Sequence, residues 1–272
     1  MLATVLFYLG HLVDSRDHYD EAIALADREP RVVLPDGRDP GVSCRAQMGR
    51  VLWLLGYPDQ ALAMSELALS RARRAEQPLA LVFAMFLDML RRQLSRDVAG
   101  TAQAAQALLA LAAEHDLPQY RAWASIVSGW ALAANDPSGG IARMREHLAA
   151  YERMGSELSR SHFLALLADA LGAAGSCDEG LAVIEQALAS VERTGERYYL
   201  AELYRLGGEL SFRSSDAPRR DRATDTFRQA IAQARGQQAR SWELRAATSL
   251  MRAATTDVTK ADAREARALL GL

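Results

Sequence analysis

The chain has 272 residues, of which 50% are hydrophobic and 24% charged, and its formal net charge is −2. This length is enough for a continuous hydrophobic core, and the near-neutral charge gives no sign of a nucleic-acid or anionic-membrane binder. Two cysteines, Cys44 and Cys177, are too few for a disulfide framework, and we interpret both as small buried apolar residues.

The first predicted element is a helix within the apolar run Met1–Val13. This run lacks a basic flank and a small-residue cleavage site, and it is too short to span a bilayer. We therefore expect no signal peptide, no membrane segment and a cytoplasmic protein. No capping residue precedes the helix, whereas solenoids usually carry polar capping repeats. We expect either a fragment of a longer polypeptide or a partner that covers Leu2, Leu6 and Leu9.

Small residues then recur along the chain at a nearly constant spacing. The markers are Ala22, Ala61, Gly100, Gly140, Gly180 and Ala223, separated by 39, 39, 40, 40 and 43 residues. An apolar–small pair precedes several markers by twelve residues, as Met48-Gly49 precedes Ala61. Leu206-Gly207 precedes Ala223 by sixteen because of an insertion at Arg213–Arg220. Antiparallel helices cross closely at small residues, so this period of about 40 predicts repeated helical hairpins.

In chain order, the expected hairpins are six complete pairs and a terminal pair. They cover residues 1–30, 41–76, 79–116, 119–154, 158–194, 197–236 and 239–272. Within them, apolar residues recur at helical spacing. We predict an all-α, right-handed solenoid of about thirteen or fourteen helices, forming a single domain over 1–272. An irregular loop is expected at Pro30–Pro40 and a last helix at Ala261–Leu270.

The pattern Leu-Gly, then Gly-x-Tyr-x-x-Ala, then an apolar residue and an alanine resembles the tetratricopeptide repeat, although that family's usual period is 34. The stretches Gly37–Val42 and Leu52–Pro58 look like the C-terminal helical array of large bacterial signalling proteins. In those proteins, a class III nucleotide cyclase or kinase domain and an AAA-type ATPase module precede the array. The resemblance runs through nearly the whole chain and implies a bacterial helical-repeat module in signalling.

Motifs for catalysis are missing from the sequence. A nucleotide-binding loop needs a lysine after glycine, but Lys260, the only lysine, follows Thr259. The five histidines form no HExxH and lack the spacing of zinc ligands. The acidic pairs Asp20-Glu21 and Asp178-Glu179 suit the positive ends of helices. We therefore predict no enzyme, no cofactor and no metal.

In tetratricopeptide arrays the first helix of each hairpin lines the concave wall. The corresponding positions here are Phe7, His11, Arg50, Trp53, Trp123, Ile126, Trp130, His162, Asp169 and Tyr204, with Asp88 and Arg92 from the weaker third repeat. Three of the four tryptophans would then share one surface, which is typical of an interaction site. Alternatively, these tryptophans fill the space between helices, since a register error of one residue would turn Trp123 or Trp130 inward.

Two classes of function remain. The first is a non-catalytic scaffold that binds a protein or peptide partner in its concave groove. The second is a small-molecule sensor with an apolar pocket around Trp53, Trp123 and Trp130. Nucleic-acid binding through Arg219, Arg220 and Arg222 is only weakly indicated, because Asp216 and Asp221 lie among them.

Overall fold

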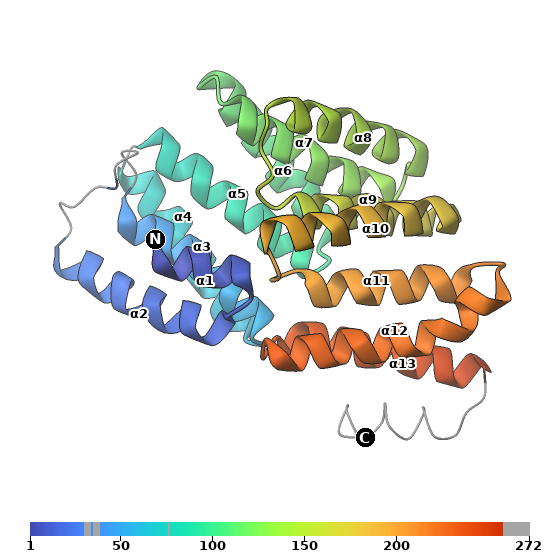
Figure 1. Cartoon of the computed structure of the whole chain (residues 1–272). Coiled ribbons are helices and arrows are strands. Elements are labelled where there is room, and N and C mark those ends of the chain that lie inside the picture. Colours follow the sequence, from blue (N-terminus) through green and yellow to red (C-terminus); the bar gives the residue numbers. More distant parts are fainter. Residues whose placement is uncertain (30–33, 35–38, 76, 258–272) are drawn as a thin grey trace. The chain divides into compact units, whose positions relative to one another are not determined.

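In the computed structural model, which describes residues 1–29, 34, 39–75 and 77–257, the chain forms thirteen helices and no strand within those residues (Figure 1). The helices are α1 Leu2–Leu9, α2 Leu12–Arg28, α3 Pro40–Leu54, α4 Pro58–Ala75, α5 Pro78–Leu94, α6 Val98–Glu114, α7 Pro118–Ala133, α8 Pro137–Arg153, α9 Arg160–Ala173, α10 Cys177–Thr194, α11 Leu200–Arg213, α12 Ala217–Gly236 and α13 Arg240–Asp257. The predicted all-α fold of helical repeats is confirmed.

Aspartate and proline residues determine where many helices begin. Asp39 accepts a hydrogen bond from the backbone N–H of Gly41 at 2.6 Å, and Asp136 accepts one from Gly139 at 3.0 Å. These N–H groups have no partner inside the helix, so the carboxylates satisfy them. The hydrogen bond from Gly139 also lowers the pKa of Asp136. Proline occupies the first position of α3, α4, α5, α7 and α8, where its missing N–H is harmless.

The two helices of a hairpin approach each other at small residues. A Cβ added to Gly140 of α8 would lie 2.5 Å from both the backbone nitrogen of Ala133 and the carbonyl oxygen of Gly129. Only glycine therefore allows α7 and α8 to come this close. A Cβ on Gly49 of α3 would likewise lie 3.2 Å from the carbonyl oxygen of Ala61. The sequence markers Ala61 and Gly140 thus lie at helix crossings.

The marker proposed for the first hairpin is wrong. Ala22 lies in the middle of α2, and Gly10 lies in the turn before α2 with φ +86°. The close contact is made by Ser15, which is fully buried and donates a hydrogen bond to the carbonyl oxygen of Ala3 at 2.7 Å. The link from α2 to α3 is longer than the links between the other helices. The sequence analysis missed this difference because Ala22 and Ala61 are 39 residues apart, as are Ala61 and Gly100.

The expected insertion at Arg213–Arg220 is also corrected. α11 ends at Arg213 and α12 already begins at Ala217, so most of the insertion extends a helix. Pro218, in the first turn of α12, suits a helix start and does not interrupt it. Most of the expected loop Pro30–Pro40 and the whole expected helix Ala261–Leu270 lie outside the described residues.

The chain divides into two compact units. Unit 1 comprises Met1–Phe7 and His11–Ser156, and unit 2 comprises Tyr8–Gly10 and the chain from Glu157 onward. In each unit, a helix packs against its hairpin partner and odd-numbered helices also pack on one another, α3 on α5 on α7 and α9 on α11 on α13. No comparable packing joins successive even-numbered helices among the described residues. The odd-numbered helices therefore form one continuous wall in each unit.

Candidate functional site

The wall of odd-numbered helices is where the chain buries its large polar side chains. Arg50 of α3, His162 of α9, and Glu202 and Arg205 of α11 are all buried. Of the polar and charged residues on the even-numbered helices, within the described residues, only four small hydroxyl residues are buried, namely Ser15, Ser65, Thr101 and Ser190. Because burying charge is unfavourable unless it is paired, this asymmetry marks the odd-numbered helices as the candidate site.

The candidate site of unit 1, called the unit 1 face below, is made by α3, α5 and α7. It comprises Arg50, Trp53, Phe86, Trp123, Ile126 and Trp130. Trp53, Trp123 and Trp130 are each 6% exposed and Ile126 is fully buried. The indole of Trp123 stacks on Phe86 with ring centroids 4.6 Å apart and contacts Tyr151 of α8 edge-on. These side chains thus lie among packed helices, and the expected exposed aromatic stripe is not present at them.

Two side chains of the unit 1 face have buried nitrogens without a hydrogen-bond partner. They are Nε and Nη1 of Arg50 and Nε1 of Trp123. Arg50 is 1% exposed; its Nη2 donates to Gln47, and its guanidinium lies 4.4 Å from the ring centroid of Phe7. Phe7 is therefore close to Arg50, as the repeat register implied, whereas His11 is exposed in the turn before α2.

The register that the sequence analysis assigned to the third repeat is wrong by one residue. Arg92 bonds to Asp88 at 2.7 Å and to Asp97 at 3.4 Å, and both Asp88 and Arg92 line a groove between α4, α5 and α6. Thr101, the fourth residue of α6, occupies the buried crossing position that was assigned to Gly100. One residue rotates a helical position by about 100°. Asp88 and Arg92 are therefore not part of the candidate wall, whereas Phe86 is.

The same shift affects Tyr204 in unit 2. A Cβ on Gly208 would lie 2.6 Å from the ring of Phe227, whereas one on Gly207 would meet nothing closer than 3.6 Å. Gly208, and not Gly207, is thus the small residue at the crossing of α11 and α12. Tyr204 packs instead on the hydrophobic cluster around Phe227 and Leu250. The corrected register places charged residues where the sequence analysis placed this tyrosine.

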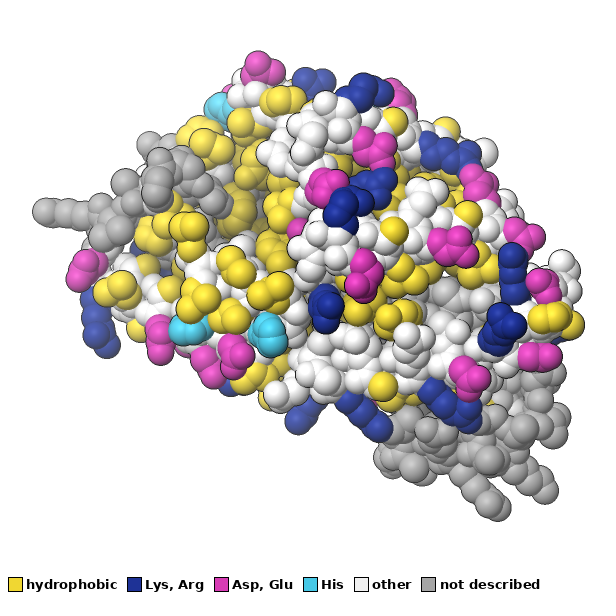
Figure 2. All heavy atoms as spheres, viewed as in Figure 1, with side chains coloured by type: hydrophobic (Ala, Val, Ile, Leu, Met, Phe, Trp, Pro, Cys, Tyr) yellow, Lys and Arg dark blue, Asp and Glu magenta, His cyan; other side chains and the backbone are white. Residues whose placement is uncertain are grey.

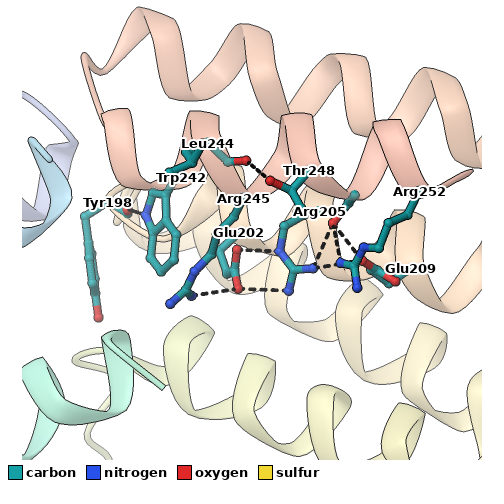
Figure 3. Close-up of polar contacts among 10 residues, drawn as sticks. Tyr198, Glu202, Arg205, Glu209, Trp242, Leu244, Arg245, Thr248 and Arg252 are labelled. Carbon is teal, nitrogen blue, oxygen red and sulfur yellow. Dashed lines mark hydrogen bonds and ion pairs between the residues drawn. The ribbon is translucent and has the colours of Figure 1, made fainter. Parts of the chain in front are cut away.

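The unit 2 face comprises His162, Asp169, Glu202, Arg205, Glu209 and Arg245. Figure 3 shows Arg205 between two carboxylates, with Arg245 and Arg252 reaching in from α13. Arg205 donates to both oxygens of Glu202, at 2.7 and 3.0 Å, and its Nη1 donates to Glu209 at 3.2 Å. Ser249 of α13 donates to Glu209 at 2.6 Å and accepts from Arg205 at 3.2 Å. This network ties α11 to α13.

The charge of Arg205 is strongly stabilised. Its burial would lower its pKa, but the charge of Glu202, the hydrogen bonds to Glu202 and the charges of Glu209 and Asp169 outweigh that effect and raise it. Asp169, predicted from the sequence, thus acts electrostatically on a residue that the sequence analysis missed. The network remains accessible at its rim, where the side chain of Arg252 is 63% exposed.

His162 belongs to an aromatic cluster of unit 2. Its ring stacks on Tyr199 with centroids 4.0 Å apart, and its Nδ1 lies 3.1 Å from the hydroxyl oxygen of Tyr198. Trp242 contacts Tyr199 edge-on and donates from Nε1 to the carbonyl oxygen of Tyr198 at 3.3 Å. His162 is 1% exposed. The fourth tryptophan, which the sequence analysis left unassigned, therefore packs near a predicted site residue.

Two further properties concern the chemistry and surface of the described chain. No group of three or more His, Cys, Asp or Glu residues in it is placed to hold a metal ion. None of its helices combines the length and hydrophobicity needed to cross a bilayer.

Hydrophobic side chains gather over α1 in Figure 2, where Leu2 and Val5 are more than half exposed.

Comparisons with known proteins give a relative and a structural neighbour. No family model matches the chain. A curated protein of Rhizobium meliloti (strain 1021), named "Uncharacterized protein R02095", is 24% identical over 249 residues, which are 90% of this chain and 24% of the relative. The chain therefore spans about a quarter of the length of that relative.

The solved structure titled "Crystal Structure of the Apo Form of RapI" is similar over 100% of this chain and 99% of that chain, with a TM-score of 0.60. The two sequences are 12% identical. This likeness shows a shared helical-repeat fold.

Proposed function

We propose that the chain is a non-catalytic scaffold that binds a protein or peptide partner on the faces of its odd-numbered helices. In a longer protein of the kind that the sequence resembles, it would serve as a regulatory module beside catalytic domains. The relative from Rhizobium meliloti, about four times as long as the matched segment, is compatible with such an arrangement.

One observation carries the proposal: large polar and charged side chains are buried on odd-numbered helices and not on even-numbered ones. A purely structural solenoid would gain more stability from apolar residues there, because a buried ion pair often contributes less than a hydrophobic pair of similar size. Polar groups held in fixed positions on one wall are what a specific binding surface requires.

Unsatisfied donors point in the same direction. Nε and Nη1 of Arg50 and Nε1 of Trp123 are buried donors on the unit 1 face. A peptide offers a carbonyl acceptor at every residue and can satisfy such groups. Leaving a buried donor unpaired costs about 1–3 kcal/mol, so a partner that pairs it gains affinity.

The proposal is tested with two matched double variants of the purified chain. Arg245→Gln with Arg252→Gln removes the two arginines of α13 that pair with Glu202 and Glu209 of the unit 2 face. Arg193→Gln with Arg228→Gln removes two arginines from ion pairs on even-numbered helices of the same unit. Proteins captured from a native lysate by the wild-type chain are identified by mass spectrometry and then bound in purified form.

We expect the first double variant to weaken binding of the captured partner about tenfold or more and the second to leave it within about twofold. Equal binding by all three proteins would contradict the proposed site. If native mass spectrometry instead finds a small molecule retained by the wild-type chain, the sensor function would replace the scaffold.

A further inference from the structure

Arg50 is an exception among the buried arginines of the described chain. Four arginines are buried there: Arg45, Arg50, Arg91 and Arg205. Arg45 pairs with Asp27 at 2.6 Å, Arg91 with Asp88 at 2.7 Å and Arg205 with Glu202 at 2.7 Å. Arg50, the most deeply buried of the four at 1% exposure, has no carboxylate partner among the described residues.

The surroundings of Arg50 do not compensate for its charge. Its Nη2 donates to the neutral amide of Gln47, and its guanidinium lies 4.4 Å from the ring centroid of Phe7. The attraction between an aromatic face and a cation is small compared with the cost of burying an unpaired ion. A water molecule could accept hydrogen bonds there but would not neutralise the charge.

We infer that Arg50 binds a carboxylate group of an acidic peptide partner. The inference rests on the proposed scaffold function and identifies one contact of that partner. Nε and Nη1 together carry three N–H groups that are buried and unpaired, and arginine donates such groups to carboxylates in charge-assisted hydrogen bonds. Gln47 and Phe7 hold the guanidinium in place.

A carboxylate fits this site better than a phosphate group. A phosphate monoester carries a charge of about −1.5 to −2 at neutral pH and is commonly bound by clusters of arginines. Arg50 supplies one positive charge, which a single carboxylate neutralises. A carboxylate also suits the apolar ring of Phe7, because its own charge is cancelled once the pair has formed.

Entry to the site requires movement of α1. The ring of Phe7 covers one side of the guanidinium, while Leu2 and Val5 on the same helix are exposed. Association is expected to be slower than the usual 10⁵–10⁷ M⁻¹s⁻¹ range of roughly rigid partners, because a conformational change must accompany it.

Two single variants of the full chain test the charge of Arg50 in the absence of a partner. Arg50→Met removes an uncompensated buried cation and is expected to leave the melting temperature unchanged or to raise it. Arg45→Met, on the same helix, breaks an ion pair with Asp27 and is expected to lower the melting temperature by about 3 °C or more. A large loss of stability in Arg50→Met would mean that the charge already has a compensating partner.

The ligand is tested with an array of random hexapeptides. Each sequence is printed with Asp, Asn, Ser or phosphoserine at one position, and with a free or an amidated C-terminus. We expect the wild-type chain to bind carboxylate members about tenfold better than their matched amides, since hydrogen bonds between two charged groups are stronger than those to a neutral amide. Arg50→Met should reduce this ratio to within about twofold, whereas Arg45→Met should preserve it.

The outcomes separate this inference from the proposed function. Peptide binding without a carboxylate preference, or with a preference that survives in Arg50→Met, overturns the inference and leaves the scaffold standing. Phosphoserine members that bind better than Asp members assign the site to a phosphorylated ligand and overturn it too. Absence of binding to every peptide overturns the inference, and the Arg245 and Arg252 variants test the scaffold independently.

Discussion

Glu202 is the carboxylate on which the polar network of the unit 2 face depends. Its side chain is 2% exposed and receives two hydrogen bonds from Arg205, with Arg245 at 3.5 Å. Glu202→Gln keeps the shape of the side chain but removes the charge that both arginines face. Breaking a buried ion pair in this way typically costs about 3–5 kcal/mol. We expect a loss of that size in the free energy of unfolding, measured by urea denaturation.

The exposed pair of Arg193 and Glu157, 2.7 Å apart, provides the control. About half of each side chain is accessible to solvent, so Glu157→Gln should change stability by less than about 1 kcal/mol. Equal losses in the two variants would mean that Glu202 is as well solvated as Glu157.

Trp123 tests whether the aromatic residues of the unit 1 face belong to the core. The sequence left two alternatives, an exposed stripe or a filling of the space between helices. At 6% exposure and stacked on Phe86, the indole is expected to contribute as a core residue, so Trp123→Ala should lose about 3–5 kcal/mol. A thermal melt within a few degrees of the wild type, combined with weaker partner binding, would restore the exposed stripe.

His147 of α8 should make stability depend on pH. Burial lowers its pKa, Glu146 opposes this, and Arg143 and Arg121 lower it further. The folded chain therefore binds this proton less readily than the unfolded chain. Stability from His147 is complete above the ordinary histidine pKa, about 6.5, and declines as the pH falls through that value. Urea midpoints at pH 7.5 and 5.5 should differ less in His147→Gln than in the wild type.

At the scale of elements, the crossing of α7 and α8 is the tightest contact to probe. Gly140→Ala places a methyl group 2.5 Å from two backbone atoms that move only if the helices separate. Overpacking of this kind costs about 1–3 kcal/mol. Gly236→Ala, at the end of α12, meets nothing within 4 Å and should stabilise by about 0.5–1 kcal/mol. Circular dichroism melts of both variants give the comparison, and equal shifts would contradict the close approach.

Elements were predictable from the sequence because helix periodicity and turn residues are local signals. The hairpins were predicted from the recurrence of small residues about every 40 positions, with apolar residues at helical spacing between them. Which residues lie on the wall of odd-numbered helices depends on the register of each repeat. An error of one residue in that register led the sequence analysis to select Tyr204 in place of Arg205. The sequence offered a signal, since Gly207-Gly208 contains two candidates for one crossing. Only the approach of Phe227 to Gly208 distinguishes them.

The polar network could not be foreseen for a different reason. Its members come from α11 and α13, and residues that meet, such as Arg205 and Ser249, are 44 positions apart. Charged residues on separate helices look like solvent-exposed residues when read from a single sequence. Their burial becomes apparent only when the odd-numbered helices pack on one another.

At the scale of the whole molecule, the chain consists of two compact units, while the single domain predicted from the sequence stays a prediction. We expect a destabilising change to act first in the unit that contains it. Glu202→Gln should therefore increase hydrogen exchange in α9 to α13, measured by mass spectrometry of peptic fragments. Gly140→Ala should increase it in α2 to α8. An increase spread evenly over all helices in both variants would mean that the two units unfold as one.

The basic member of nearly every ion pair described above is an arginine, and the chain has one lysine, Lys260. Amine-reactive reagents and enzymes that acetylate or ubiquitinate lysine therefore have no target on either candidate face. In the laboratory, an amine-directed dye would label only Lys260 and the terminal amine. A partner could then be titrated against a fluorescent chain whose arginines are untouched.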